Sequence, residues 1–449
     1  MDEILTGIHK ESNGLPANSR SEPVSAGRLD ISQWGTKTGE PARIPSLLYL
    51  GLNRGYSRLG SDAIVASLRY EACQNAQEGD PAYFCRVGRL IVKALVLSGG
   101  GARGAYEAGV LCGLANAGER FDLVCGTSIG AINASFLVQD LLPDLEHFWR
   151  SIASRNIIRL IPQAQHVQEF VTGFEDFLKL PLDAKIFRLP HIIELYGRIG
   201  SKVALLSLLG VVDRAPLTAI LTGKLNVNNL KCSLIITATN ITQETADTFY
   251  AFVRTDGASD EARVQSDFLG RVRSQTYLLS NTNFLSAVEA SASIPLAFEP
   301  VKFNHGTGRD FYYVDGGVAN NTPIGFAIAA GATDITVIFM DPEVTAPPYQ
   351  MIPNAAVLGM ACYDVMQQKI LADDMKLAVM TNKALSAADS QEQKELGLED
   401  KVQVTLRVVR PKLPLDLTVL AFGDQAKLTA AFEVGRSDAS QIQTVWSPK

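Results

Sequence analysis

The sequence lacks the features of a disulfide framework and of a metal site. Its 449 residues include six cysteines and five histidines, with no CxxC pair and no HxxxH pair. Scattered cysteines in a chain of this length indicate reduced thiols rather than disulfides. Dispersed Cys and His residues also disfavour a zinc site. We therefore expect neither a metal ion nor any other cofactor.

Long apolar runs and an excess of basic charge are also missing. The most apolar stretch, 203–212 (VALLSLLGVV), is far shorter than the roughly 20 residues that span a bilayer. The N-terminus has no basic region followed by an apolar segment, so a signal peptide is not expected. Lys and Arg number 41 against 47 Asp and Glu, which disfavours a nucleic-acid partner. We expect a cytoplasmic protein, at most peripheral at a membrane surface.

Composition divides the chain into a tail, an appendage and a core domain. Residues 1–45 are rich in Ser, Gly, Pro, Asn and charged residues, which is typical of disorder. Residues 46–89 carry apolar helical faces and no chemical motif. The core domain is expected over 90–440, because 90–97 is an apolar run ending in glycines, as a buried parallel strand is. Residues 151–226 are expected to be a helical insertion in it.

Strand and helix patterns alternate through this domain. Strands are expected at 90–97, 121–125, 231–239, 334–340 and 401–409, and helices at 105–117, 131–138 and 424–440. This order predicts an α/β sheet whose functional loops follow the carboxyl ends of the strands.

A glycine-rich segment, SGGGARG at 98–104, follows the first expected strand. Consecutive glycines let backbone N–H groups converge on an anion, and the N-terminus of the next helix lies behind them. The anion is either a phosphate or the oxyanion of an acyl-transfer intermediate.

The same segment also has the GxGxxG spacing of a dinucleotide site, which requires an acidic residue at the end of the second strand. Asp122 has about the right separation, but it precedes that strand. No Gly-Lys-Ser/Thr follows the glycines, so a Walker loop is excluded. Dinucleotide binding is therefore disfavoured.

The second expected strand leads into a candidate nucleophile. Gly126-Thr127-Ser128-Ile129-Gly130 reads GxSxG between an apolar run and a small-residue helical pattern. In a strand–turn–helix context, the sharp turn lifts the hydroxyl of such a serine out of the sheet. Gly126 and Gly130 permit the tight turn and close packing of helix on strand. The helix dipole favours negative charge that develops at this point.

A serine nucleophile needs a base, and the candidates are a histidine or a carboxylate. No histidine after Ser128 stands at the end of a strand pattern, whereas Asp315 ends an apolar run and precedes Gly316 and Gly317. An aspartate before two glycines is also a common turn former, so this motif alone leaves a structural role open. A carboxylate in a partly dry pocket is a better base, and we favour a Ser128–Asp315 dyad.

Three segments in this order resemble the patatin-like phospholipase family: GGGxRG at 99–104, GxSxG at 126–130 and DGG at 315–317. The segment at 290–301 and the end of the domain from residue 410 are also similar to the family. The resemblance covers about 90–440. Ser98 departs from it, since many plant members carry aspartate there.

The resemblance implies a three-layer α/β/α domain that hydrolyses fatty acyl esters, with Ser128 as nucleophile and Asp315 as base. It also implies that one loop supplies the oxyanion hole, through Gly99, Gly100, Gly101, Arg103 and Gly104. The expected substrate is a membrane phospholipid or another acyl lipid.

Several alternatives stay open. The same dyad would serve a thioesterase or a hydrolase of small esters, and the glycine loop would also suit a non-catalytic module that binds anionic lipid. Residues 1–89 are candidates for gating access to the site. Residues 203–212 form either a buried helix, which is favoured, or a helix in a lipid interface.

Overall fold

The computed structural model describes residues 92–155, 157–161, 210–253, 261–343, 355–398 and 401–448. The tail expected at 1–45, the appendage at 46–89, and 162–209 of the expected insertion lie outside the described residues. The apolar run at 203–212 is therefore described only in its last three positions.

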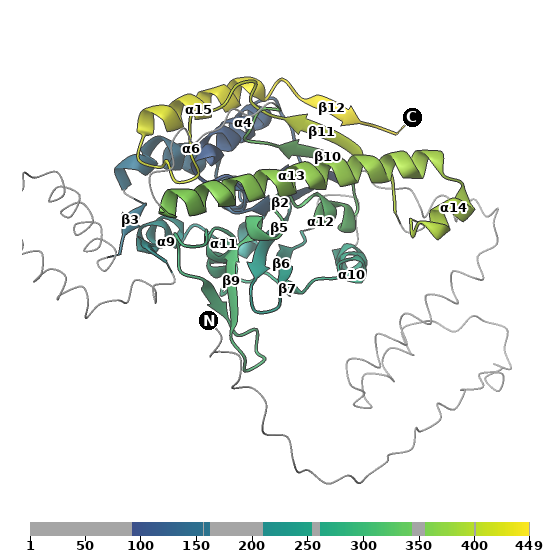
Figure 1. Cartoon of the computed structure of the whole chain (residues 1–449), viewed down its shortest axis with the longest axis horizontal. Coiled ribbons are helices and arrows are strands. Elements are labelled where there is room, and N and C mark those ends of the chain that lie inside the picture. Colours follow the sequence, from purple (N-terminus) through teal and green to yellow (C-terminus); the bar gives the residue numbers. More distant parts are fainter. Residues whose placement is uncertain are drawn as a thin grey trace, which may run out of the picture. The chain divides into compact units, whose positions relative to one another are not determined.

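A mixed sheet forms the centre of the described chain (Figure 1). Its strand order is β12-β11-β10-β1-β2-β5-β6-β7. These strands are β1 (Val92–Leu97), β2 (Leu123–Thr127), β5 (Ser233–Asn240), β6 (Thr245–Ala251), β7 (Thr276–Leu278), β10 (Ala332–Ile338), β11 (Thr405–Val409) and β12 (Gln443–Trp446). The neighbours from β11 to β5 are parallel. Strand β12 runs antiparallel to β11, and β6 runs antiparallel to β5, whereas β7 is parallel to β6.

Helices cover both faces of this sheet. The principal ones are α4 (Gly104–Asn116), α5 (Ile129–Leu137), α6 (Leu142–Ser151), α9 (Ala215–Leu221), α10 (Glu261–Arg271), α11 (Phe284–Ser291), α12 (Ile324–Ala329), α13 (Ala355–Ala387), α14 (Ser390–Glu395) and α15 (Gln425–Asp438). Figure 1 shows α4, α6 and α15 grouped together and the long α13 crossing the domain.

Alternation along β1 assigns the helices to two layers, because successive side chains of a strand point to opposite faces. Leu95 and Leu97 pack in one core with residues of α4, α5, α6, α11 and α15. Ala94 and Val96 pack in another core with residues of α10, α12 and α13. The predicted three-layer α/β/α architecture is confirmed.

Each strand and helix expected in the core domain is present, with ends that differ by a few residues. The 33-residue helix α13 was not expected. Its outer surface exposes the apolar residues Leu358, Val365, Leu377 and Met380. Apolar residues on the solvent side obscure the 3.6-residue period by which a surface helix is usually found.

Two strands meet end to end along one edge of β5. The parallel strand β2 pairs with β5 as far as Thr127 opposite Thr237. The antiparallel strand β9 (Phe311–Asp315), which also pairs with β8 (Val301–Phe303), occupies the same edge with Asp315 opposite Ala238. Because the two strands run toward each other, their carboxyl ends come together beside the middle of β5.

Candidate active site

Ser128 lies on a strained turn between β2 and α5. Its backbone has φ 57° and ψ −126°, a left-handed φ that residues other than glycine rarely adopt. The turn is tight enough to exclude side chains at both flanking positions. A Cβ at Gly126 would lie 2.6 Å from the Gly130 carbonyl oxygen, and a Cβ at Gly130 would lie 2.6 Å from that of Leu97.

Replacing Gly130 with alanine is expected to destabilise the domain by about 2–3 kcal/mol, because overpacking against fixed backbone has no cheap relief. Gly325 is a matched control, because it is likewise the second residue of its helix but a Cβ there would have nothing within 4 Å. Gly325→Ala should be neutral or slightly stabilising. Urea unfolding measures both changes, and equal stability of the two variants would contradict the packing argument.

The side chains of Ser128 and Asp315 are in direct contact. The Ser128 hydroxyl donates a hydrogen bond to Oδ2 of Asp315, and the amide of Gly317 donates to Oδ1 at 2.8 Å. Asp315 thereby caps the short 3-10 turn Gly316–Val318 that follows β9. Ser128 is 2% exposed and Asp315 is fully buried. The pair therefore lies in a water-poor environment.

This burial changes the acidity of the carboxylate. Desolvation raises the pKa of Asp315 to about 6, and hydrogen bonds from Ser128, Gly317 and Tyr363 oppose part of that rise. A carboxylate with a pKa near the working pH is still largely ionised at neutral pH and accepts protons more readily than an ordinary aspartate.

Ser291, at the end of α11, fixes the backbone of the serine turn. Its hydroxyl accepts a hydrogen bond from the Ser128 amide at 2.9 Å and donates to the Thr237 carbonyl on β5 at 2.6 Å. This contact links the turn to the strand beside which β2 and β9 meet.

The glycine-rich loop after β1 uses some of its amides within the protein. The Gly99 amide donates to both the side-chain and main-chain oxygens of Asn321, at 3.1 and 3.2 Å. The amide of Ala102 donates to the Val419 carbonyl at 2.9 Å. Within the described part of the chain, the amides of Gly100 and Gly101 have no partner. Gly101 has φ +58°, and a Cβ there would lie 2.1 Å from the Val419 oxygen.

Arg103 is engaged with partners within the protein and holds the glycine loop in place. Its guanidinium is 4% exposed and pairs with Asp341 and Asp364. Its Nε also donates to the Gly100 carbonyl at 3.3 Å. Gly104, the last residue of the motif, begins α4, where a Cβ would lie 2.4 Å from Ile129.

The two described histidines have their contacts with residues other than Ser128 and Asp315. His305, in the loop between β8 and β9, stacks on Tyr277 at 3.6 Å and hydrogen-bonds the Tyr313 hydroxyl. His147 contacts Arg155 on the surface. His9, His166 and His191 lie outside the described residues.

Sequence reasoning did not single out several residues around the pair. They are Ser291, Asn321, Tyr363, Asp364 and Gln367. Ser291 lies in the segment 290–301, which was noted for its similarity to the family. The α13 residues carried no local signal, because their relation to the site depends on how a distant helix packs.

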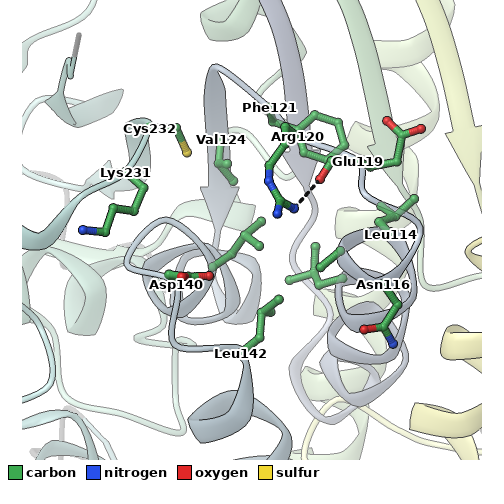
Figure 2. Close-up of a pocket in the computed structure, with 13 residues that line it drawn as sticks. Leu114, Asn116, Glu119, Arg120, Phe121, Val124, Asp140, Leu142, Lys231 and Cys232 are labelled. Carbon is green, nitrogen blue, oxygen red and sulfur yellow. Dashed lines mark hydrogen bonds between the residues drawn. The ribbon is translucent and has the colours of Figure 1, made fainter. Parts of the chain in front are cut away.

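A pocket of about 310 Å³ lies elsewhere in the domain (Figure 2). It is lined by residues at the end of α4, the start of β2, the end of α5, the start of α6 and the segment before β5. They include Leu114, Arg120, Phe121, Leu142 and Lys231. Ser128 follows the opposite end of β2, so this pocket is separate from the serine–aspartate pair.

The described residues show no group of His, Cys, Asp and Glu side chains suited to a metal ion. None of the described helices combines the length and the hydropathy that a membrane span requires.

Together, the fold and this site define an α/β protein with a serine–carboxylate pair at the ends of two strands, the arrangement of an acyl-transfer enzyme. The chain belongs to the patatin-like phospholipase family, whose family model matches residues 95–328. Membership of this family of lipid acyl hydrolases confirms the resemblance noted in the sequence.

Comparison with curated proteins finds no match. Among solved structures, the chain is similar to the crystal structure of VipD from Legionella pneumophila, with 15% identity and a TM-score of 0.33. That similarity covers 79% of this chain and 68% of the other.

Proposed function

We propose that this protein is a phospholipase A-type serine hydrolase that releases fatty acids from acyl lipids. The observation that carries the proposal is the hydrogen bond from the Ser128 hydroxyl to the buried Asp315 carboxylate. It joins a nucleophile on a strained turn to a base of raised pKa, which is the minimum that acyl transfer requires.

In the first step, Asp315 Oδ2 takes the proton of Ser128 as Oγ attacks the acyl carbonyl carbon. The carbonyl oxygen becomes an oxyanion, and the unpartnered amides of Gly100 and Gly101 are the loop donors available to stabilise it. The backbone amide of Ile129 lies at the N-terminus of α5. The dipole of that helix also favours negative charge on the oxyanion. Collapse of the tetrahedral intermediate expels the alcohol of the lipid, which receives the proton from Asp315.

In the second step, Asp315 accepts a proton from water as the water attacks the acyl-serine. The same amides stabilise the second oxyanion, and its collapse releases the fatty acid and returns the proton to Ser128. Arg103 maintains the loop through its ion pairs with Asp341 and Asp364 and does not contact the reacting atoms.

Membership of the patatin-like phospholipase family supports a fatty acyl substrate over a small soluble ester. The surroundings of the pair are apolar. An apolar cluster beside the pair brings together side chains from four regions of the chain: Val212, Ile294, Ala297, Phe298, Tyr363 and Val419. Met360 and Met366 pack against it, and methionine adapts readily to irregular apolar shapes. The buried side chains of this cluster keep water away from the surroundings of the pair.

The direct test is a substrate panel with the full-length protein. We expect fatty-acid release from phosphatidylcholine vesicles to exceed turnover of water-soluble butyrate esters and acyl thioesters. Turnover restricted to short soluble esters or to thioesters would replace the lipase assignment with one of these activities. Vesicle binding without any turnover, and without labelling of Ser128 by a fluorophosphonate, would indicate a non-catalytic lipid-binding module.

A further inference from the structure

Helix α13 contacts the candidate active site although it lies beyond residues 95–328, the segment that the family model matches. Tyr363 and Gln367 are one helical turn apart and therefore share a face. Both are buried, and so is the neighbouring Asp364. This short stretch of α13 is in contact with the base and with the glycine loop.

Tyr363 is oriented toward Asp315 by a hydrogen-bond chain. The Gln367 side-chain amide donates to the Tyr363 hydroxyl at 2.6 Å. Because that hydroxyl oxygen is then an acceptor from Gln367, its own proton is free to be donated. That proton is directed to Asp315, where the interaction favours the ionised carboxylate. The geometry agrees, because Gln367 Nε2 and Asp315 Oδ1 lie 2.2 and 3.1 Å from the point that a Cβ of Gly317 would occupy. The carboxylate thus receives hydrogen bonds from Ser128, the Gly317 amide and Tyr363.

The position of Tyr363 is fixed by its neighbours on α13. The Gln367 carbonyl accepts a hydrogen bond from the Asn321 side chain at 3.4 Å, and Asn321 also accepts from the Gly99 amide. Asp364 pairs with Arg103 of the glycine loop. The Tyr363 ring itself is 8% exposed and packs in the apolar cluster beside the pair. The helix therefore has little freedom to withdraw the hydroxyl.

We propose that Tyr363 is a positioning residue for the general base, and that its hydroxyl, oriented by Gln367, holds the Asp315 carboxylate toward the Ser128 hydroxyl. The role rests on the proposed function, because it acts on the same serine–aspartate pair. Tyr363 does not need to contact the substrate or the oxyanion. Tyr363 lies on α13, outside the segment that the family model matches, whereas Ser128 and Asp315 lie within that segment.

Few charged side chains of the described chain act on Asp315 and Tyr363. Within the described residues, no charged side chain contributes to the acidity of Asp315; burial and the three hydrogen bonds determine it. Tyr363 faces the charges of Asp315 and Asp364, and Asp364 is paired with Arg103. Loss of the tyrosine hydroxyl therefore has one predicted electrostatic effect, a rise in the pKa of Asp315.

The test is Tyr363→Phe in the full-length protein, with kcat and KM for phosphatidylcholine vesicles measured from pH 4.5 to 9. The acid limb is the part of the pH profile in which kcat/KM falls because Asp315 becomes protonated. Removing one donor to the ionised carboxylate should move this limb up by about one pH unit. At pH 5 that shift corresponds to about a tenfold loss, and at pH 9 ionisation alone costs less than twofold. The effect should appear in kcat, with KM nearly unchanged.

Tyr106→Phe is the matched control, because Tyr106 is a buried tyrosine that donates to the Asp438 carboxylate, at 3.2 Å, away from the site. It should leave the acid limb in place. Gln367→Met retains the tyrosine and removes its orienting donor, so it should shift the limb in the same direction by less. The pH dependence of fluorophosphonate labelling of Ser128 repeats the measurement without lipid.

The outcomes separate this role from the proposed function. An active wild type, an inactive Ser128→Ala variant and a Tyr363→Phe variant with the wild-type acid limb would overturn the positioning role alone. Equal fatty-acid release by wild type and Ser128→Ala would overturn the proposed function itself. A shifted limb in Tyr363→Phe, absent from Tyr106→Phe, would support the assignment.

Discussion

Replacing Ser128 with alanine is expected to lower fatty-acid release from phospholipid vesicles by at least about 10³-fold. Alanine removes the only atom that attacks the acyl carbon in the proposed mechanism and leaves the oxyanion donors in place. The residual rate should be that of a site that binds the ester without forming an acyl-enzyme. Titration of released fatty acid, with mass spectrometry for the acyl-serine, measures both consequences.

Ser135→Ala is the control for this variant. Ser135 is another buried serine nearby in the chain, on α5, and its hydroxyl donates only to the Ala131 carbonyl, at 2.7 Å. It should retain wild-type turnover, with the modest loss of stability that follows removal of a local hydrogen bond. Full activity in Ser128→Ala, or equal losses in the two variants, would show that Ser128 is not the nucleophile.

Asp315→Asn should cost about 10³-fold in kcat, because an amide of the same shape cannot take the serine proton. The wild-type kcat/KM should also rise with pH through an apparent pKa close to 6, the value to which burial raises Asp315. Below that pH the carboxyl is protonated and cannot act as base; above it the carboxylate is available. The residual activity of Asp315→Asn should lack this acid limb.

Although Asp315→Asn should lower activity, it should raise the stability of the protein at neutral and alkaline pH. Because the pKa of Asp315 is raised above its ordinary value of 3.8, the neutral carboxyl is favoured in the folded state. Its stabilising contribution is fully present below about pH 4 and is lost as the pH rises through about 6. At pH 8, Asp315→Asn should therefore be more stable than wild type by about 2–3 kcal/mol, with no gain at pH 4.

Urea unfolding at the two pH values measures this difference. Asp438→Asn is the comparison, since Asp438 is a buried acceptor from the Tyr106 hydroxyl remote from the pair. It should keep wild-type activity. An Asp315→Asn protein that is active, or that gains as much stability at pH 4 as at pH 8, would contradict the assignment of Asp315 as a buried ionised base.

The sequence by itself determined the parts of the protein that are encoded locally. The alternation of apolar runs and helical patterns predicted the α/β class, because strand and helix periods are properties of neighbouring residues. The GxSxG turn and the glycines after Asp315 were predictable for the same reason: tight turns and close backbone approaches admit few residue types. Three such motifs in one order were sufficient to indicate the family.

Only the tertiary structure decided how these parts meet. Ser128 and Asp315 are 187 residues apart, and they come together because β2 and β9 approach each other along one edge of β5. The sequence does not indicate that Asn321 accepts the hydrogen bond of the Gly99 amide, or that α13 brings Tyr363 to the base. Those contacts depend on the packing of distant segments, which no local period or spacing encodes, and the acidity of Asp315 follows from the burial that this packing creates.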